Sequence, residues 1–300
     1  MGARAAIGAQ DAPADLPDGI ANAMREFRFS TRDFGRVQKM IRARAGISLS
    51  DSKFNMVYSR LSRRLRATKF DAFDAYLDRI EGDARFCAVE LPEFVNALTT
   101  NLTSFFREPH HFPILAEFLA QRRGQTGVKL WCAAASTGEE PYTIAMTMIE
   151  SLGSETDARL LATDIDTKVL AQAQSGVFSA EAAQVCGQAR LQKFFLRGKE
   201  ANEGKVRVRP GLARLVNFAP LNLLEDRWPA LEKFAGELDA LFCRNVMIYF
   251  DRPTQHALLA RFAQALAPGG LLFVGHSENF TDCRDWFFLR GKTVYEKVKR

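Results

Sequence analysis

The sequence predicts an α/β protein in which a small all-helical module precedes a larger domain built on a mostly parallel sheet. Two patterns support this prediction. From Thr31 to about Leu98, apolar residues recur at helical spacing, whereas after His111 short apolar runs alternate with helical stretches, which is typical of βαβ units. The chain has 300 residues, of which 47% are hydrophobic, so it can bury a core in both parts.

The helical module is expected to follow an N-terminal tail. Residues 1–27 show no apolar period, so they cannot offset the entropy cost of ordering, and we expect a disordered tail. Residues 28–88 are expected to form the helical domain, and 89–115 a linker to the larger domain. Four helices are predicted, beginning near residues 31, 53, 73 and 90; Gly46 ends the first, and Ser50, Asp51 and Ser52 are cap candidates for the second.

The larger domain, residues 116–300, is expected to begin near a helix at 113–122. Its last two apolar runs flank Gly291-Lys292, a link suited to a type II′ hairpin that would close the sheet with an antiparallel edge. Between 194 and 218 the alternation of Val206 and Val208 with arginines predicts a small antiparallel β-insert. The strands of the main sheet are expected at residues 128–134, 159–163, 215–218, 238–242, 270–274, 286–290 and 293–297.

Composition narrows the class of protein. No run approaches the roughly 18 apolar residues of a membrane span, and the N-terminus lacks the apolar core of a secretion signal, so we expect a cytoplasmic protein without membrane insertion. The five cysteines form no C-x-x-C pair, which favours reduced thiols over disulfides or zinc. His110 and His111 are adjacent, and neighbouring side chains on a helix diverge, so we expect no metal.

The charge of the chain suggests an acidic partner. The formal net charge is +6 and the sequence pI about 9.1, which permits nucleic acid as well as protein. A basic run lies mostly away from the apolar stripe of the second helix. It can be an ordinary solvated face or a surface for an acidic partner, and the residues alone leave both readings open. Its members are Lys53, Arg60, Arg63, Arg64 and Arg66.

The loops that follow the strands are the candidate ligand site, because open α/β sheets bind ligands beyond the carboxyl ends of their strands. The loop after the first strand has small residues but lacks G-x-G-x-x-G, which weakens a dinucleotide reading. Asp164, about 26 residues after Gly138, is placed to accept hydrogen bonds from a ribose diol. Asp166 is the alternative acid, although it can simply cap the next helix. Asn222 and Asn245 offer mixed donors and acceptors.

Five segments, taken in order, resemble the CheR family of chemotaxis receptor methyltransferases. They are NALTTNLTSFFRE (96–108), AAASTGEEPY (133–142), TDID (163–166), FCRNVMIYF (242–250) and GHSENF (275–280). The resemblance extends from about Phe34 to Tyr295. It implies an S-adenosylmethionine-dependent methyltransferase with a Rossmann-like sheet, and a reaction that converts receptor glutamates to methyl esters for sensory adaptation and leaves S-adenosylhomocysteine.

The resemblance also implies that the linker at 89–115 contributes to the cofactor site, and it implies roles for individual residues. Arg107 would lie near the amino-acid end of the cofactor, and Tyr249 beside the reacting methyl group; these two are the catalytic candidates. Glu140 and Asp164 would hold the amino-acid and ribose parts. The complete set of implied cofactor residues is Asn101, Thr103, Arg107, Glu140, Asp164, Asn222, Leu223, Arg244 and Asn245.

The implied partners are methyl-accepting chemotaxis receptors. Their acidic cytoplasmic helices would be bound by Arg60, Arg63, Arg64 and Arg66, and a C-terminal receptor peptide could add a strand to the β-insert. A nucleic-acid methyltransferase is disfavoured, because an Asn-Pro-Pro-Tyr-type segment is missing at residues 244–249. A binding module without turnover is the alternative from another class, yet Arg107, Glu140, Asp164 and Tyr249 are all present.

Overall fold

The computed structural model describes residues 25–154, 156–234, 237–280 and 283–298. Most of the expected tail, residues 1–24, therefore lies outside the described residues. Phe27, which the tail was expected to include, is buried and packs edge-on against Phe73 with ring centroids 6.4 Å apart. The helical domain thus begins before residue 28. Within the described chain, no helix combines the length and apolar character needed to cross a membrane.

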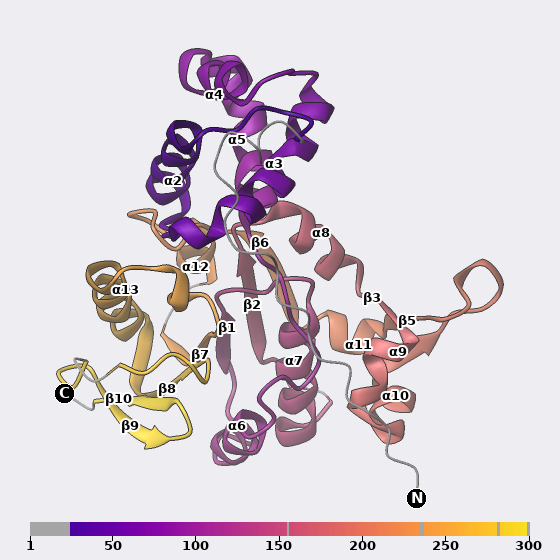
Figure 1. Cartoon of the computed structure of the whole chain (residues 1–300). Helices are drawn as coiled ribbons and strands as arrows, with labels where there is room; N and C mark the ends of the chain where they lie inside the picture. Colours follow the sequence, from indigo (N-terminus) through magenta and orange to yellow (C-terminus); the bar gives the residue numbers. More distant parts are fainter. Residues whose placement is uncertain (1–24, 155, 235–236, 281–282, 299–300) are drawn as a thin grey trace, which may run out of the picture.

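Four helices form the helical domain at the top of Figure 1: α2 (Thr31–Ala45), α3 (Phe54–Thr68), α4 (Phe73–Gly82) and α5 (Ala84–Leu98). α2 begins with a capping box between Ser30 and Asp33 and ends at Gly46, as expected. The start of α3 differs from the prediction. A short 3-10 turn, η1 (Asp51–Lys53), precedes it, and no side chain caps α3.

The boundary between the two domains also differs from the prediction. α5 is continuous from Ala84, and Phe94, Val95 and Leu98 are buried in the core of the helical domain. The first ten residues of the expected linker at 89–115 are therefore part of a packed helix. The connection between the domains begins only after Leu98.

The main sheet confirms the predicted fold class. Its seven strands lie in the order β6-β2-β1-β7-β8-β10-β9. The first five pair in parallel, and β10 pairs antiparallel with both of its neighbours, β8 and β9. In chain order the strands are β1 (Lys129–Cys132), β2 (Arg159–Asp164), β6 (Val216–Pro220), β7 (Leu238–Cys243), β8 (Leu266–Val274), β9 (Phe287–Gly291) and β10 (Val294–Lys297).

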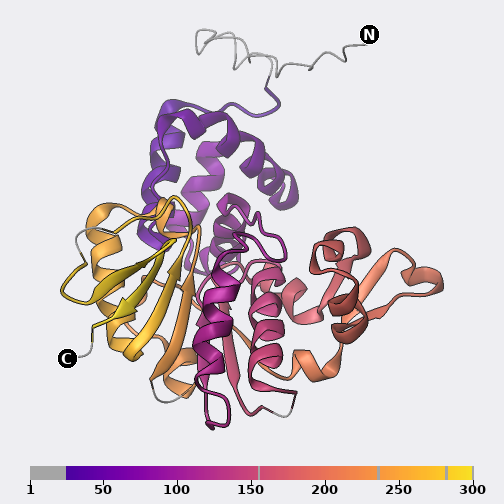
Figure 2. The same cartoon turned by 90° about the horizontal axis from the view of Figure 1, so that it is seen from below.

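Helices cover both faces of this sheet, as Figures 1 and 2 show. Successive side chains of a strand point to opposite faces, so Leu130 joins one hydrophobic core and Trp131 the other. The core around Leu130 is shared with α6 (His111–Ala120) and α7 (Glu139–Leu152), and the core around Trp131 with α12 (Pro229–Phe234) and α13 (Arg252–Ala265).

The hairpin at the sheet edge uses a different turn from the one predicted. Gly291 pairs with Val294, so the two-residue loop is Lys292-Thr293 and not Gly291-Lys292. Both loop residues have positive φ, 52° and 60°, which is typical of a type I′ turn. A register shift between Val294 and Tyr295 accompanies the tight turn.

The β-insert is a separate three-stranded antiparallel sheet in the order β3-β5-β4. It comprises β3 (Val177–Ser179), β4 (Phe195–Arg197) and β5 (Lys205–Val208). It begins before residue 194, because β3 directly follows α8 (Thr167–Ser175), and residues 216–218 belong to β6 of the main sheet. Both views show it projecting from the side opposite the β9–β10 hairpin (Figures 1 and 2).

Strand order places the ligand crevice. From β1 the chain goes to β2 and β6 on one side and then crosses to β7 on the other, so the order reverses between β1 and β7. The helical domain packs onto the loops at the carboxyl ends of these strands. Hydrogen bonds across this interface join Ser48 N–H to Tyr249 O (2.9 Å) and Asn222 Nδ2 to Arg44 O (2.7 Å).

Gly46→Ala should destabilise the protein by about 1–3 kcal/mol, because Gly46 has φ +68° and a Cβ there would lie 2.5 Å from Leu224 Cδ1. Gly35→Ala is the matched control, since a Cβ in this part of α2 meets nothing within 4 Å; it should stabilise by about 0.5–1 kcal/mol. Chemical denaturation measures the free energy of unfolding of both variants. Equal changes in the two would contradict the conclusion that Gly46 is required by its positive φ and close packing.

Candidate functional site

A cavity of about 640 Å³ opens between the helical domain and the carboxyl ends of the main sheet, a size within the range of small-molecule sites. The loops after β1, β2, β6 and β7 line it, together with α3 and the segment joining the domains. All nine predicted cofactor residues line this cavity, and so do Arg60 and Tyr249. The nine come from segments far apart in sequence that the strand reversal brings together.

Asp164 is a buried carboxylate at the end of β2. Oδ2 accepts a hydrogen bond from Ser136 N–H (2.8 Å), and Oδ1 accepts one from Asp166 N–H (2.9 Å). Burial raises the pKa of Asp164 to about 6, although these N–H groups oppose the shift. An acceptor held in this way at the carboxyl end of a strand is suited to bind hydroxyl donors such as a ribose diol.

Asp166 caps α8, as the alternative reading proposed. Its Oδ1 accepts from Lys168 N–H (2.9 Å) and Val169 N–H (3.3 Å). Its Oδ2 accepts from Asn101 Nδ2 (2.8 Å) and Thr99 Oγ1 (3.0 Å). Asp166 therefore ties the inter-domain segment to the sheet, and it is not among the described residues lining the cavity.

A buried ion cluster forms one wall of the cavity. The guanidinium of Arg244 pairs with Glu140 at the start of α7, lies 3.3 Å from Glu108 Oε2, and donates to Arg107 O (2.6 Å). Burial opposes the charge of Arg244, but Glu140 and Glu108 raise its pKa. Breaking such a buried pair costs roughly 3–5 kcal/mol, so the cluster fixes three segments relative to one another.

Four other predicted residues complete the wall. Arg107 Nη1 donates to Leu102 O (2.7 Å). Asn222 Oδ1 accepts from Leu224 N–H (3.0 Å), which shapes the loop after β6. Asn245 has φ +59°, and its Nδ2 donates to Glu108 Oε1 (3.3 Å). Thr103 is half-buried in the same cavity.

The basic run divides into residues that bind within the protein and residues that face solvent. Arg60 donates to Leu98 O (2.9 Å) and Thr99 O (2.7 Å). Arg64 binds the buried Glu90 with both Nε (2.8 Å) and Nη2 (2.7 Å).

The remaining members lie on the surface. Arg66 is exposed and pairs with Glu26 (2.5 Å). Arg63 and Lys53 are exposed, and the structure gives neither an ion pair within its described residues. Sequence spacing alone could not separate these roles, because the partners of Arg60, Arg64 and Arg66 lie in other segments of the chain.

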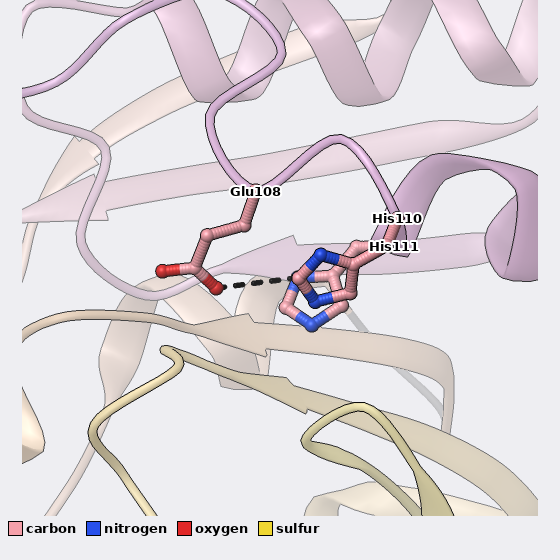
Figure 3. Close-up of side chains that lie close together, drawn as sticks. All are labelled: Glu108, His110 and His111. Carbon is pink, nitrogen blue, oxygen red and sulfur yellow. Dashed lines mark ion pairs between the residues drawn. The ribbon is translucent and has the colours of Figure 1, made fainter.

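Glu108, His110 and His111 could hold a metal ion by geometry, since their ligand atoms lie within 4.8 Å of one another (Figure 3). Adjacent histidines here do not diverge as expected, because His110 is the cap residue before α6. The charges oppose a cation, since Arg244 lies 3.3 Å from Glu108 Oε2. Burial and Arg244 lower the pKa of His111 to about 4, so its contact with Glu108 is no ion pair at neutral pH. The absence of a metal stays a prediction.

The sequence reasoning missed two acidic residues beside the cavity. Burial would raise the pKa of Glu108, but hydrogen bonds from His276 and the charge of Arg244 lower it to about 2. Glu278 accepts hydrogen bonds from three backbone N–H groups. Both lie inside the motifs that carry the family resemblance, which was the available signal, but only the fold shows what they contact.

Comparisons with known proteins identify the family of both domains. Residues 32–99 match the all-alpha domain of CheR methyltransferases, and residues 101–295 match their SAM binding domain. The chain is 48% identical over 281 residues to the chemotaxis protein methyltransferase of Klebsiella aerogenes, covering 93% of this chain and 94% of that protein. It is 49% identical over 271 residues to that of Escherichia coli K12, covering 90% and 92%.

Proposed function

The chain belongs to the CheR methyltransferase family, and from this premise we propose that it transfers the methyl group of S-adenosylmethionine to glutamate side chains of chemotaxis receptors in the cytoplasm. The products would be glutamate methyl esters and S-adenosylhomocysteine, and the process served would be sensory adaptation. The observation that carries the proposal is the cavity lined by Asp164, Arg244 and Tyr249. It lies where the strand order reverses, in the part of the chain that matches a SAM binding domain.

The residues of the cavity fit this cofactor. In the proposal, Asp164 accepts from the ribose hydroxyls, and Asn222 and Leu223 contact the adenine side of the cavity. The amino-acid end faces Arg107 and Glu140, which offer opposite charges for a carboxylate and an ammonium group. Asn101, Thr103, Arg244 and Asn245 complete the lining.

The chemistry needs positioning more than proton transfer. When bound, S-adenosylmethionine supplies an electrophilic methyl group on a positively charged sulfur. The acceptor carboxylate is already ionised near pH 7, so no residue of the chain has to act as a general base. Oriented reactants can recover roughly 7–11 kcal/mol of barrier. We assign the orienting role to Tyr249 and Arg107, the two catalytic candidates.

The route of the receptor helix follows α3. Lys53, Met56 and Arg60 line the cavity, and Arg63 continues this face by one helical turn. Since Arg60 and Arg64 are held within the protein, we propose that Arg63 meets the acidic receptor surface first, with Arg66 at the end of the helix and Arg60 and Arg64 behind it. An acidic protein helix, and not nucleic acid, is the proposed partner.

The β-insert is proposed as a second receptor contact. Its outer strands β3 and β4 each pair on one side with β5. A C-terminal receptor peptide could therefore add to a strand edge. The insert projects from the side of the main sheet opposite the β9–β10 hairpin (Figure 2), and none of its described residues lines the cavity. This position suits a tether better than a site that holds the substrate.

Incubation of the full chain with labelled S-adenosylmethionine and receptor cytoplasmic fragments should give base-labile methyl groups on glutamate residues, identified by mass spectrometry. Binding of S-adenosylhomocysteine without transfer would instead support a binding module. Label appearing only in added nucleic acid would refute the proposed substrate class.

The affinity for S-adenosylhomocysteine should depend on pH through Asp164. Its pKa of about 6 means that the ionised acceptor is lost as pH falls, so affinity should be about tenfold lower at pH 5 than at pH 8. Calorimetric titration measures this. Asp164→Asn should bind more weakly at both pH values and lose the dependence; an unchanged dependence in that variant would remove Asp164 from the role.

Arg63→Glu should slow receptor methylation several-fold at low salt, and added salt should reduce the difference, because the surface attraction is screened. Its affinity for S-adenosylhomocysteine should stay unchanged. Arg159→Glu is the matched control, since Arg159 is exposed at the start of β2, at the opposite end of the sheet. Equal rates for both variants at every ionic strength would contradict the proposed route.

A further inference from the structure

Glu278 packs against the loop after β7, which carries three of the proposed site residues, Arg244, Asn245 and Tyr249. It follows β8 and is buried, with 3% of its surface exposed. It is not among the described residues that line the cavity, so it is not expected to touch cofactor or substrate. Residues 245, 246 and 248–250, on the loop after β7, do line the cavity.

The carboxylate of Glu278 binds this loop through its backbone. Oε2 accepts hydrogen bonds from Gly275 N–H (2.5 Å) and Asn245 N–H (3.0 Å). Oε1 accepts one from Ile248 N–H (3.3 Å). One side chain therefore fixes the loop at two points on either side of Val246, and joins it to the loop after β8.

The loop needs such an anchor because of its conformation. Asn245 has φ +59°, a region that non-glycine residues seldom occupy. Space is also tight, since a Cβ at Gly275 would lie 2.4 Å from Asn245 Nδ2 and 2.9 Å from Glu278 Oε2. Buried N–H groups without an acceptor are costly, and only a carboxylate presents acceptors on both of its terminal atoms.

We propose that Glu278 is a positioning residue for methyl transfer, which acts through Asn245 and Tyr249 by holding the loop after β7 in its binding geometry. The inference rests on the proposed function and extends it to a residue outside the cavity. A misplacement of about 1 Å can cost 100-fold in rate, so the anchor controls catalysis without contacting the reactants.

Glu278→Gln tests the proposal, because the amide removes one acceptor and keeps the shape of the side chain. At a temperature where the variant is folded, kcat should fall about tenfold or more while the KM for receptor stays within about twofold. Hydrogen–deuterium exchange of residues 244–250 should become faster. A merely structural role would lower the melting temperature without changing kcat of the folded protein.

Asp239→Asn is the matched control. Asp239 lies at the opposite end of β7 and also accepts from a backbone group, Lys129 N–H (2.9 Å), so its loss should leave kcat unchanged. If Glu278→Gln does not fold, Gly275→Ala disturbs the same contacts with the carboxylate kept, and the same results are expected.

An unchanged kcat in the folded variant, or a lower kcat without faster exchange of residues 244–250, would overturn the proposal. Failure of the proposed function looks different, because the unmodified protein itself would then transfer no methyl group.

Discussion

The geometry of the cavity depends on one buried guanidinium. Arg244 pairs with Glu140 from α7, lies against Glu108 from the inter-domain segment, and donates to Arg107 O. Arg244 thus contacts two segments that lie more than a hundred residues before it in the sequence. Leaving its buried charge unpaired would be costly. The cavity of the proposed methyl-transfer site lies against this cluster, since Arg107, Glu140 and Arg244 all line it.

A second constraint is the position of the helical domain over the carboxyl ends of the strands. Ser48, Arg44 and Arg42 contact the loops after β6 and β7, and Arg42 pairs with Asp251 (2.6 Å). The cavity is therefore closed by helices that also carry the basic face. If the proposed function holds, the basic residues of α3 and the proposed reacting centre are adjacent, so binding and orientation of the acceptor can be one event.

The arginines of one helix differ in what they contact. On α3, Arg64 is committed to the buried Glu90, to which Tyr76 also donates (2.7 Å), whereas Arg63 remains exposed. Desolvation explains the difference, because a charge that packs against another helix must be neutralised there. A run of positive residues in sequence can therefore contain both side chains that pair inside the protein and side chains that face solvent.

The sequence by itself indicated the fold class and the order of the strands along the chain, and its resemblance to the CheR family indicated nine of the residues that line the cavity, because apolar periodicity and contiguous motifs are local properties. Only the tertiary structure decided what those residues contact. In the folded protein, Asp166 caps α8, and Arg60 and Arg64 bind groups within the helical domain. Glu278 holds the loop after β7 by accepting from its backbone. Hydrogen bonds and ion pairs between distant segments depend on packing, which no local pattern records.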